Sequence, residues 1–96
     1  LFIADEAYAE YVSDPKFKSM AGLIQDGLDN VVLLKTFSKL YAMAGMRVGF
    51  AVGAPSIIKM MKDQVAGEKL NYPGVTAALV SLDDEPFQAY SRAERF

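Results

Sequence analysis

The stretch KTFSKLYAMAGMRVGF, residues 35–50, decides the fold of this chain. The apolar run Val31 to Leu34 precedes it, and hydroxyl side chains and a lysine, Lys39, stand where that run stops. An arginine, Arg47, follows eight positions after the lysine. A lysine at a strand end is usually a solvated surface cation, but a desolvated amine there can attack a carbonyl group. The neighbours of Lys39 therefore decide between a surface residue and a catalytic one.

A second informative stretch, LFIADEAY, forms residues 1–8. Its apolar part is short and stops at Asp5, which predicts a buried strand. Two later segments are also apolar and partly β-branched, and they predict two further strands. Strands this uniformly apolar fit an α/β sheet that is covered on both faces by helices. The three expected strands are Leu1–Ala4, Val31–Lys35 and Met46–Val52.

Local signals predict the helices between and after these strands. The segment from Ala7 to Val12 is expected to be a helical or irregular turn, because the breaker Ser13-Asp14-Pro15 follows it. Proline in a first turn, apolar residues at near-helical spacing and an acidic start predict the other helices. We expect these over Ser19–Gln25, from Pro55 to about Ala66, from Pro73 to about Asp83, and from Asp84 onward.

Composition restricts the possible functions of these 96 residues. A net charge of −2 gives no basic surface for nucleic acid or acidic membranes. The sequence has no Cys and no His, which excludes thiol catalysis, imidazole acid–base chemistry and the commoner zinc sites. Hydrophobic residues make up 52% of the chain, as in a globular protein, and no apolar stretch approaches the length of a membrane span. A cytoplasmic enzyme is the simplest interpretation.

The residues around the lysine resemble the lysine signature of fold-type I enzymes that use pyridoxal 5′-phosphate (PLP). In the class I/II aminotransferases this signature is Thr/Ser-x-Ser-Lys followed eight positions later by Arg, with an Ala-Gly pair shortly before the Arg. The stretch LFIADEAY is similar to that family's apolar strand ending in Asp-Glu-Ala-Tyr. The closest resemblance is to the branch that contains histidinol-phosphate aminotransferase. The matching positions of the lysine signature are Thr36, Ser38, Lys39, Ala44, Gly45 and Arg47.

The resemblance implies a chemical role for each of three side chains. Lys39 would form a Schiff base with the cofactor aldehyde and then carry a proton between the substrate and the cofactor, a role that requires an uncharged amine near neutral pH. Asp5 would face the pyridine nitrogen of PLP and keep it protonated, so that the ring withdraws electrons. Tyr8 would hydrogen-bond the 3-oxygen of the cofactor.

By the same resemblance, the phosphate of PLP would be bound by the hydroxyls of Thr36 and Ser38 and by the guanidinium of Arg47. Hydrogen bonds to a charged group contribute about 1.5–3 kcal/mol each, so Arg47 is expected to bind the phosphate more strongly than either hydroxyl. Gly45 and Gly49 would let the backbone turn and pack closely beside the cofactor.

The resemblance also implies the architecture and extent of the protein. The chain would be an internal α/β fragment, three layers thick, of the fold-type I large domain, whose sheet is mostly parallel. The third strand would be its one antiparallel member, since the link after Lys39 is too short for a helical crossover. Residues 1–85 would belong to the PLP-binding large domain, and 86–96 would begin the connector helix toward a small domain. The loop from Lys69 to Pro73 would approach the active site of a partner subunit in a homodimer.

The implied reaction moves an amino group from an amino acid to a 2-oxo acid in the full-length protein, and the isolated 96 residues are expected to be inactive. Three alternatives remain. Another fold-type I PLP enzyme, such as a decarboxylase or lyase, would share these residues, and so would the aminotransferase-like effector domain of a transcriptional regulator. Asp5 and Glu6 at a strand end are also typical of the Mg²⁺-binding strand of ATPases, which requires a phosphate loop elsewhere in the protein.

Some of the candidate residues also have simpler interpretations. Tyr8 and Tyr11 could form a packing pair, and Ser38 could cap a turn. Arg47 could pair with a surface carboxylate. The substrate branch suggested by the two motifs is the histidinol-phosphate or the aromatic one.

Overall fold

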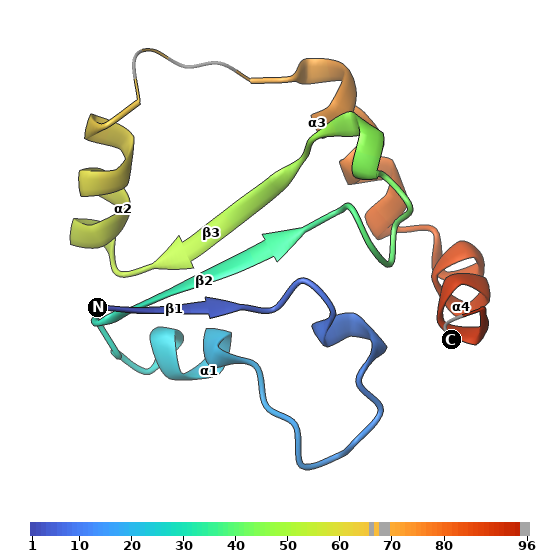
Figure 1. Cartoon of the computed structure of the whole chain (residues 1–96), viewed down its shortest axis with the longest axis horizontal. Helices are drawn as coiled ribbons and strands as arrows, with labels where there is room; N and C mark the ends of the chain where they lie inside the picture. Colours follow the sequence, from blue (N-terminus) through green and yellow to red (C-terminus); the bar gives the residue numbers. More distant parts are fainter. Residues whose placement is uncertain (66, 68–69, 95–96) are drawn as a thin grey trace.

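A three-stranded sheet forms the centre of the computed structural model, which describes residues 1–65, 67 and 70–94. The strands are β1 (Phe2–Asp5), β2 (Val31–Thr36) and β3 (Gly49–Gly53), and they lie side by side in that order (Figure 1). β1 runs parallel to β2, and β3 runs antiparallel to β2. The predicted sheet with one antiparallel strand is therefore confirmed.

Within the described ranges, four α-helices and two 3₁₀ turns connect and follow the strands. They are η1 (Ala9–Tyr11), α1 (Met20–Gln25), η2 (Ala44–Met46), α2 (Pro55–Asp63), α3 (Tyr72–Leu82) and α4 (Glu85–Ala93). Three of the α-helices begin at a side chain that accepts a backbone N–H: Ser19 before α1, Asn71 before α3 and Asp84 before α4. Such caps contribute about 1 kcal/mol each, and they place the helix starts close to the predicted ones. None of the described helices is both long enough and apolar enough to cross a membrane.

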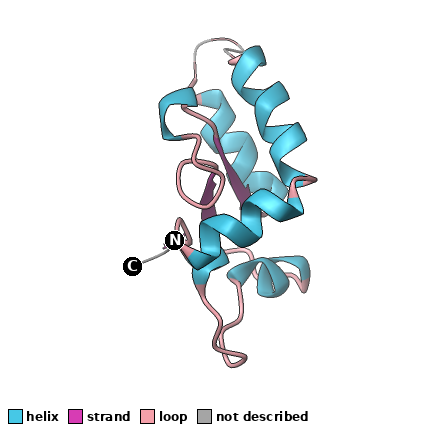
Figure 2. Ribbon diagram, turned by 90° about the vertical axis from the view of Figure 1, so that its right-hand side faces the viewer, coloured by secondary structure: helices cyan, strands magenta, loops and turns pink. Residues whose placement is uncertain are grey.

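The helices lie around the sheet, which Figure 2 shows from the side. α1 packs against β2 and β3, and α2 packs against β3. α4 lies beyond the carboxyl ends of β1 and β2 (Figure 1). Ligands of open α/β sheets bind at this end of the strands, so α4 is placed to form part of a site.

Two buried side chains fix the loop that follows β2. Leu33 on β2 and Leu40 in the loop are the least exposed residues of the core, at 2% and 1%. Phe37 is also buried. Full burial of one such side chain contributes about 1.5–3 kcal/mol. Since Phe37 and Leu40 flank Ser38 and Lys39, the core holds the loop on both sides and leaves Lys39 exposed.

β3 begins later than the sequence indicated. The prediction started this strand at Met46, but Met46 ends η2 and the next residue, Arg47, has φ 54° and ψ 56°. A left-handed backbone cannot continue an extended strand, and the ladder with β2 therefore starts at Gly49. The expectation that Arg47 opens the strand is wrong: it lies in the turn before the strand.

Some expected segments reach beyond the described residues. α2 ends at Asp63, earlier than predicted, and Ala66 itself lies outside the described residues. Lys69, at the start of the loop expected near a partner subunit, also lies outside them. The same is true of residues 95–96 of the expected connector helix. The boundary between a large domain and a connector stays a prediction.

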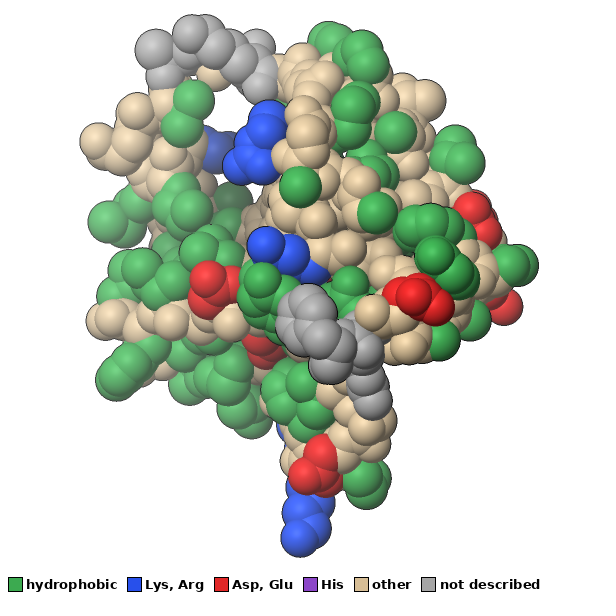
Figure 3. Space-filling model, turned by 45° about the vertical axis from the view of Figure 1, so that its right-hand side comes forward, with side chains coloured by type: hydrophobic (Ala, Val, Ile, Leu, Met, Phe, Trp, Pro, Cys, Tyr) green, Lys and Arg blue, Asp and Glu red, His purple; other side chains and the backbone are tan. Residues whose placement is uncertain are grey.

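β1 differs from the expected buried strand, because Phe2 and Ile3 are each 68% exposed. β1 forms one edge of the described sheet, so neither β2 nor the described helices cover its outer side. Figure 3 shows that hydrophobic side chains are also spread over the face turned forward there. Apolar surface of this extent is typical of protein that contacts further protein.

Gly49 is required by the close approach of β2 and β3. A Cβ at this position would lie 2.8 Å from the carbonyl oxygen of Lys35, which is a backbone atom of the facing strand. We expect Gly49→Ala to destabilise the protein by about 1–3 kcal/mol, because the two strands must move apart. A lower thermal unfolding midpoint would measure this loss.

Gly22→Ala is the matched control for that substitution. Nothing lies within 4 Å of a Cβ at Gly22, and alanine is favoured in a helix such as α1. Its midpoint should stay the same or rise. If Gly49→Ala also left the midpoint unchanged, the strands would not be as close as described.

Candidate active site

Backbone hydrogen bonds fix the loop after β2, which carries Lys39. The N–H of Phe37 donates to the Val48 carbonyl, and the N–H of Met43 donates to the Phe37 carbonyl, both at 3.1 Å. The N–H of Ala42 donates to the carbonyl of Lys39 at 2.9 Å. Ala42 has a left-handed φ of 54°, which lets the chain turn sharply after the lysine. The amine of Lys39 thus extends from a fixed base, as a functional side chain requires.

Thr36 and Ser38 form a small hydroxyl pair at the start of this loop. The Thr36 hydroxyl donates to Ser38 Oγ at 2.9 Å, and Thr36 Oγ1 accepts the N–H of Ser38 at 3.0 Å. The side chain that caps this turn is therefore Thr36, and not Ser38 as the simpler interpretation proposed. In the described part of the chain the Ser38 hydroxyl accepts a hydrogen bond and donates none, so its hydrogen can be donated to an incoming anion.

Tyr8 lies directly against Lys39. The Lys39 Nζ is 5.1 Å from the centroid of the Tyr8 ring, which is within the range of a cation–π contact. The Tyr8 ring also lies 6.3 Å from that of Tyr11, tilted by 38°. The packing pair and the contact with the lysine therefore coexist at Tyr8.

A cavity of about 530 Å³ opens beside this contact. Three parts of the chain line it: the segment around Tyr8, the loop that carries Lys39, and one face of α4. A volume of this size is typical of sites for small molecules. The lining residues are Tyr8, Tyr11, Ser38, Lys39, Ala42, Phe87, Tyr90, Ser91 and Glu94.

Asp5 ends β1 next to this cavity. It pairs with Leu34 across the parallel ladder, and its Oδ1 accepts the N–H of Ala7 at 3.1 Å. The side chain is exposed and borders a second hollow of about 370 Å³. Tyr8 borders both hollows, so the hollow at Asp5 adjoins the cavity at Lys39.

Arg47 does not line either hollow. Its guanidinium is exposed and Nη1 donates to the Ala44 carbonyl at 2.6 Å. The backbone just before it is held by α3, since the side-chain amide of Asn71 donates to the Met46 carbonyl and accepts the N–H of Gly74. Arg47 is thus fixed at its backbone, while its side chain points to its own turn.

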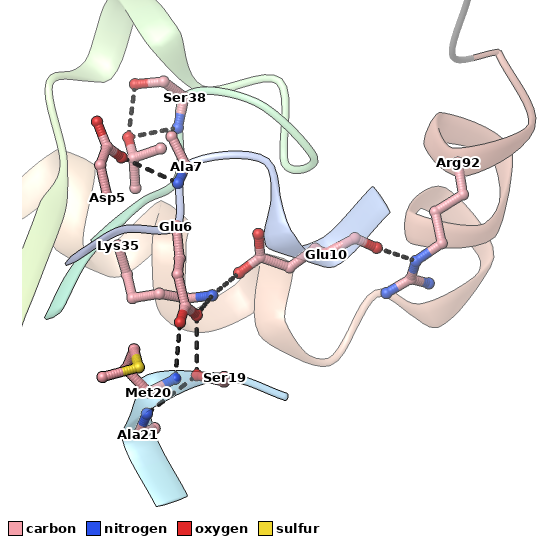
Figure 4. A network of polar contacts seen from close by, with 11 residues as sticks. Asp5, Glu6, Ala7, Glu10, Ser19, Met20, Ala21, Lys35, Ser38 and Arg92 are labelled. Atoms are coloured by element: carbon pink, nitrogen blue, oxygen red, sulfur yellow. Dashed lines mark hydrogen bonds and ion pairs between the residues drawn. The ribbon is translucent and has the colours of Figure 1, made fainter. Parts of the chain in front are cut away.

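A buried carboxylate, Glu6, organises the other side of the Tyr8 segment (Figure 4). Glu6 accepts hydrogen bonds from the Ser19 hydroxyl and the Met20 N–H, both at 2.8 Å, at the start of α1. The ammonium of Lys35 lies 3.7 Å from Glu6 Oε2 and 2.5 Å from Glu10 Oε1. Sequence reasoning missed this network, because its members are far apart in the sequence.

The structure therefore gathers part of the predicted set. Tyr8, Ser38 and Lys39 share one cavity, and Thr36 is bonded to Ser38. Asp5 borders the adjoining hollow, and Arg47 stays outside both.

The contribution of α4 was also missed. Its cavity-lining residues recur at positions i, i+3, i+4 and i+7, which is the spacing of one helix face. That stripe could have indicated a functional face. The residues are Phe87, Tyr90, Ser91 and Glu94.

Comparison with known proteins gives one consistent result. The family model for aminotransferase class I and II matches residues 1–95. A histidinol-phosphate aminotransferase of Lysinibacillus sphaericus is 41% identical over 95 residues, which are 97% of this chain and 25% of that protein. An aromatic amino acid aminotransferase of Mycobacterium tuberculosis is 40% identical over 83 residues, which are 86% of this chain and 23% of that protein.

A solved structure agrees with the sequence matches. The crystal structure of a provisionally assigned histidinol-phosphate aminotransferase from Erwinia carotovora atroseptica is similar with a TM-score of 0.91 and 56% identity, over 97% of this chain and 27% of that chain. This likeness confirms the predicted fold-type I architecture. The chain spans about a quarter of the length of the relatives it matches. By its matched residues and its fold, the chain belongs to the aminotransferase class I and II family.

Proposed function

We propose that this chain is the part of a PLP-dependent aminotransferase that carries the cofactor lysine. The full-length protein would move an amino group from an amino acid to a 2-oxo acid. The observation that carries the proposal is the position of Lys39, which lies on a fixed loop at a ligand-sized cavity, against the ring of Tyr8 and beside Ser38. In a member of this family, such an amine is the group that a cofactor aldehyde requires.

The chemistry of the described side chains fits PLP. An amine suits the aldehyde, a tyrosine hydroxyl suits the 3-oxygen, and a carboxylate suits the protonated ring nitrogen. These groups are Lys39, Tyr8 and Asp5: Lys39 and Tyr8 line one cavity, and Tyr8 and Asp5 line the adjoining hollow. Bound PLP would supply an electron-withdrawing ring that makes the α-hydrogen of an amino acid acidic.

Lys39 would act twice at this site. Its amine would first attach the cofactor. Once an amino acid has displaced it, the same amine would accept the α-proton of the substrate and pass that proton to the cofactor. Burial of Phe37 and Leu40 on both sides keeps the loop in place through both steps. Lys39 is therefore the catalytic residue of this proposal.

The phosphate would be bound beside Lys39 by the loop itself. The Ser38 hydroxyl has a hydrogen to donate, and the Thr36 hydroxyl orients it. Arg47 would complete the phosphate site by turning its exposed guanidinium away from the Ala44 carbonyl. A bidentate contact with two phosphate oxygens is stronger than one bond to a neutral carbonyl, which favours this change.

The named relatives suggest a substrate class. By their names, these proteins act on histidinol phosphate or on aromatic amino acids. We propose an amino donor of one of these two kinds for the full-length protein. A cytoplasmic homodimer is the assembly that we propose for it.

A transfer assay on the full-length protein tests this function. PLP-loaded protein is mixed with histidinol phosphate or an aromatic amino acid and with a 2-oxo acid, and both products are identified. Formation of a new amino acid from the 2-oxo acid supports the proposal. Release of carbon dioxide or ammonia would point to a decarboxylase or lyase, and PLP binding without turnover would point to a regulator domain.

The isolated 96 residues should show no measurable transfer. The described chain provides one lysine-bearing side of the site, and the relatives are about four times as long, by their covered shares. Turnover by the purified 96 residues would contradict this part of the proposal.

A further inference from the structure

Lys35 makes two ion pairs with one short turn. Its Nζ lies 2.5 Å from Glu10 Oε1 and 3.7 Å from Glu6 Oε2. The three side chains are largely buried, with exposures of 18% for Lys35, 9% for Glu6 and 19% for Glu10. Partly buried ion pairs are screened less by water and salt than exposed ones. The cluster is therefore more than a surface pair.

The turn that Lys35 closes is the one that carries Tyr8. Glu6 begins the turn and Glu10 follows it, and the N–H of Ala9 donates to the Glu6 carbonyl at 3.1 Å. One ammonium on β2 thus contacts the side chains on both sides of Tyr8 (Figure 4). Lys39, on which the Tyr8 ring rests, lies four positions after Lys35 on the same segment.

The two carboxylates depend on Lys35 to different degrees. Glu6 is also held by Ser19 and Met20 at the start of α1. In the described part of the chain, the side chain of Glu10 contacts Lys35 alone. Loss of the ammonium would therefore leave Glu6 in place and release the Glu10 side chain at the far end of the turn.

The other charged groups around the turn do not replace Lys35. Arg92 on α4 donates from Nε to the backbone carbonyl of Glu10 at 3.1 Å and not to its carboxylate. Lys39 lies over Tyr8, and no described contact joins it to Glu6 or Glu10. Without the ammonium that they share, the carboxylates of Glu6 and Glu10 repel each other, which favours opening of the turn.

We propose that Lys35 is a positioning residue that holds the Tyr8 hydroxyl at the cofactor's 3-oxygen by clamping the turn between Glu6 and Glu10. This inference rests on the proposed PLP function. Lys35 touches neither cofactor nor substrate in this arrangement. It acts only through Tyr8.

The test is the pH midpoint of the visible absorbance change of the PLP-loaded, full-length protein. The Tyr8 hydroxyl donates to the 3-oxygen and favours its anionic form, so Tyr8→Phe should raise this midpoint by about one pH unit. Lys35→Met should raise it in the same direction by at least about half as much. The double variant should rise no further than Tyr8→Phe, because both changes remove one contact. Lys35→Arg should restore most of the original midpoint.

Controls separate positioning from unfolding. Lys59→Met breaks the exposed ion pair between Lys59 and Asp63 on α2 and should leave the midpoint unchanged. If Lys35→Met does not fold, Glu10→Gln replaces it, since this variant loses the shorter ion pair and keeps the shape of the side chain. Thermal unfolding of each variant shows that it is folded under the titration conditions.

The outcomes distinguish the positioning role of Lys35 from the proposed PLP function. A raised midpoint in Lys35→Met that does not add to Tyr8→Phe supports the positioning role. A normal midpoint in Lys35→Met while Tyr8→Phe is shifted would overturn it, and so would fully additive shifts. If Tyr8→Phe itself has no effect, or if no PLP absorbance forms, the proposed function fails first and the inference falls with it.

Discussion

Replacement of Lys39 by alanine should lower the proposed amino transfer by the full-length, PLP-supplied protein by about 10⁴-fold. The substitution would remove the amine that, in the proposed function, attaches the cofactor and moves the α-proton. The other described groups of the site remain, so the cofactor should still bind through its phosphate and ring, but without a covalent bond. The measurement is the initial rate of transfer together with the visible spectrum of the PLP-loaded protein.

Lys62→Ala is the matched control for this result. Lys62 lies in the last turn of α2, is exposed and borders neither hollow at the site. Its rate should equal that of the unchanged protein. Added methylamine should restore part of the rate in Lys39→Ala, since a free amine can enter a cavity of about 530 Å³. Full activity in Lys39→Ala would exclude the catalytic role assigned here.

Asp5→Asn should give the second large effect, a loss of about 10²-fold or more in the rate of the proposed amino transfer. The asparagine amide has nearly the shape of the carboxylate but carries no charge, and it cannot hold a proton on the ring nitrogen of the cofactor. The amide oxygen can still accept the N–H of Ala7, as Asp5 Oδ1 does, so the end of β1 keeps its shape. PLP should therefore bind while transfer slows.

Two comparisons make the Asp5 result specific. Asp5→Glu keeps the charge and should lose less activity than Asp5→Asn. Asp63→Asn removes an exposed carboxylate on α2 and should have no effect on the rate. Equal rates for Asp5→Asn and the unchanged protein would show that Asp5 does not serve the ring nitrogen.

Local sequence signals predicted the sheet and most helix starts. The apolar runs before Asp5 and Lys35 predicted β1 and β2, since short apolar segments that stop at polar residues favour strands. The exposure of Phe2 and Ile3 in β1 was not predicted. Side-chain caps such as Ser19 and Asp84 gave the helix starts, because they satisfy backbone N–H groups within three residues. These signals are short-range, and a single sequence contains them in full.

Features that depend on contacts between distant segments were not predictable. The left-handed backbone at Arg47 follows from a turn that Asn71 holds from 24 positions away, and no local pattern indicates it. The ion pairs of Lys35 join β2 to a turn at the start of the chain, so no local signal distinguished Lys35. The part of α4 in the cavity depends on how the helix packs, which its sequence alone does not determine.

In the candidate site too, local motifs predicted some features, and contacts between distant segments determined the others. The lysine motif predicted which residues form the site, because its resemblance to the family links those side chains to PLP. It did not indicate that Tyr8 would border both the cavity at Lys39 and the hollow at Asp5, or that Arg47 would bond to its own turn. Those positions follow from the ladder between β1 and β2 and from the turn before β3.

The most direct measurement is a peptide map of the full-length protein after PLP loading and borohydride reduction. Borohydride makes a covalent link between a lysine amine and the cofactor permanent, so the mass of reduced PLP marks the residue that held it. The account predicts this mass on Lys39 alone and its loss in Lys39→Ala. The same mass on another lysine such as Lys35, or on none, would contradict it.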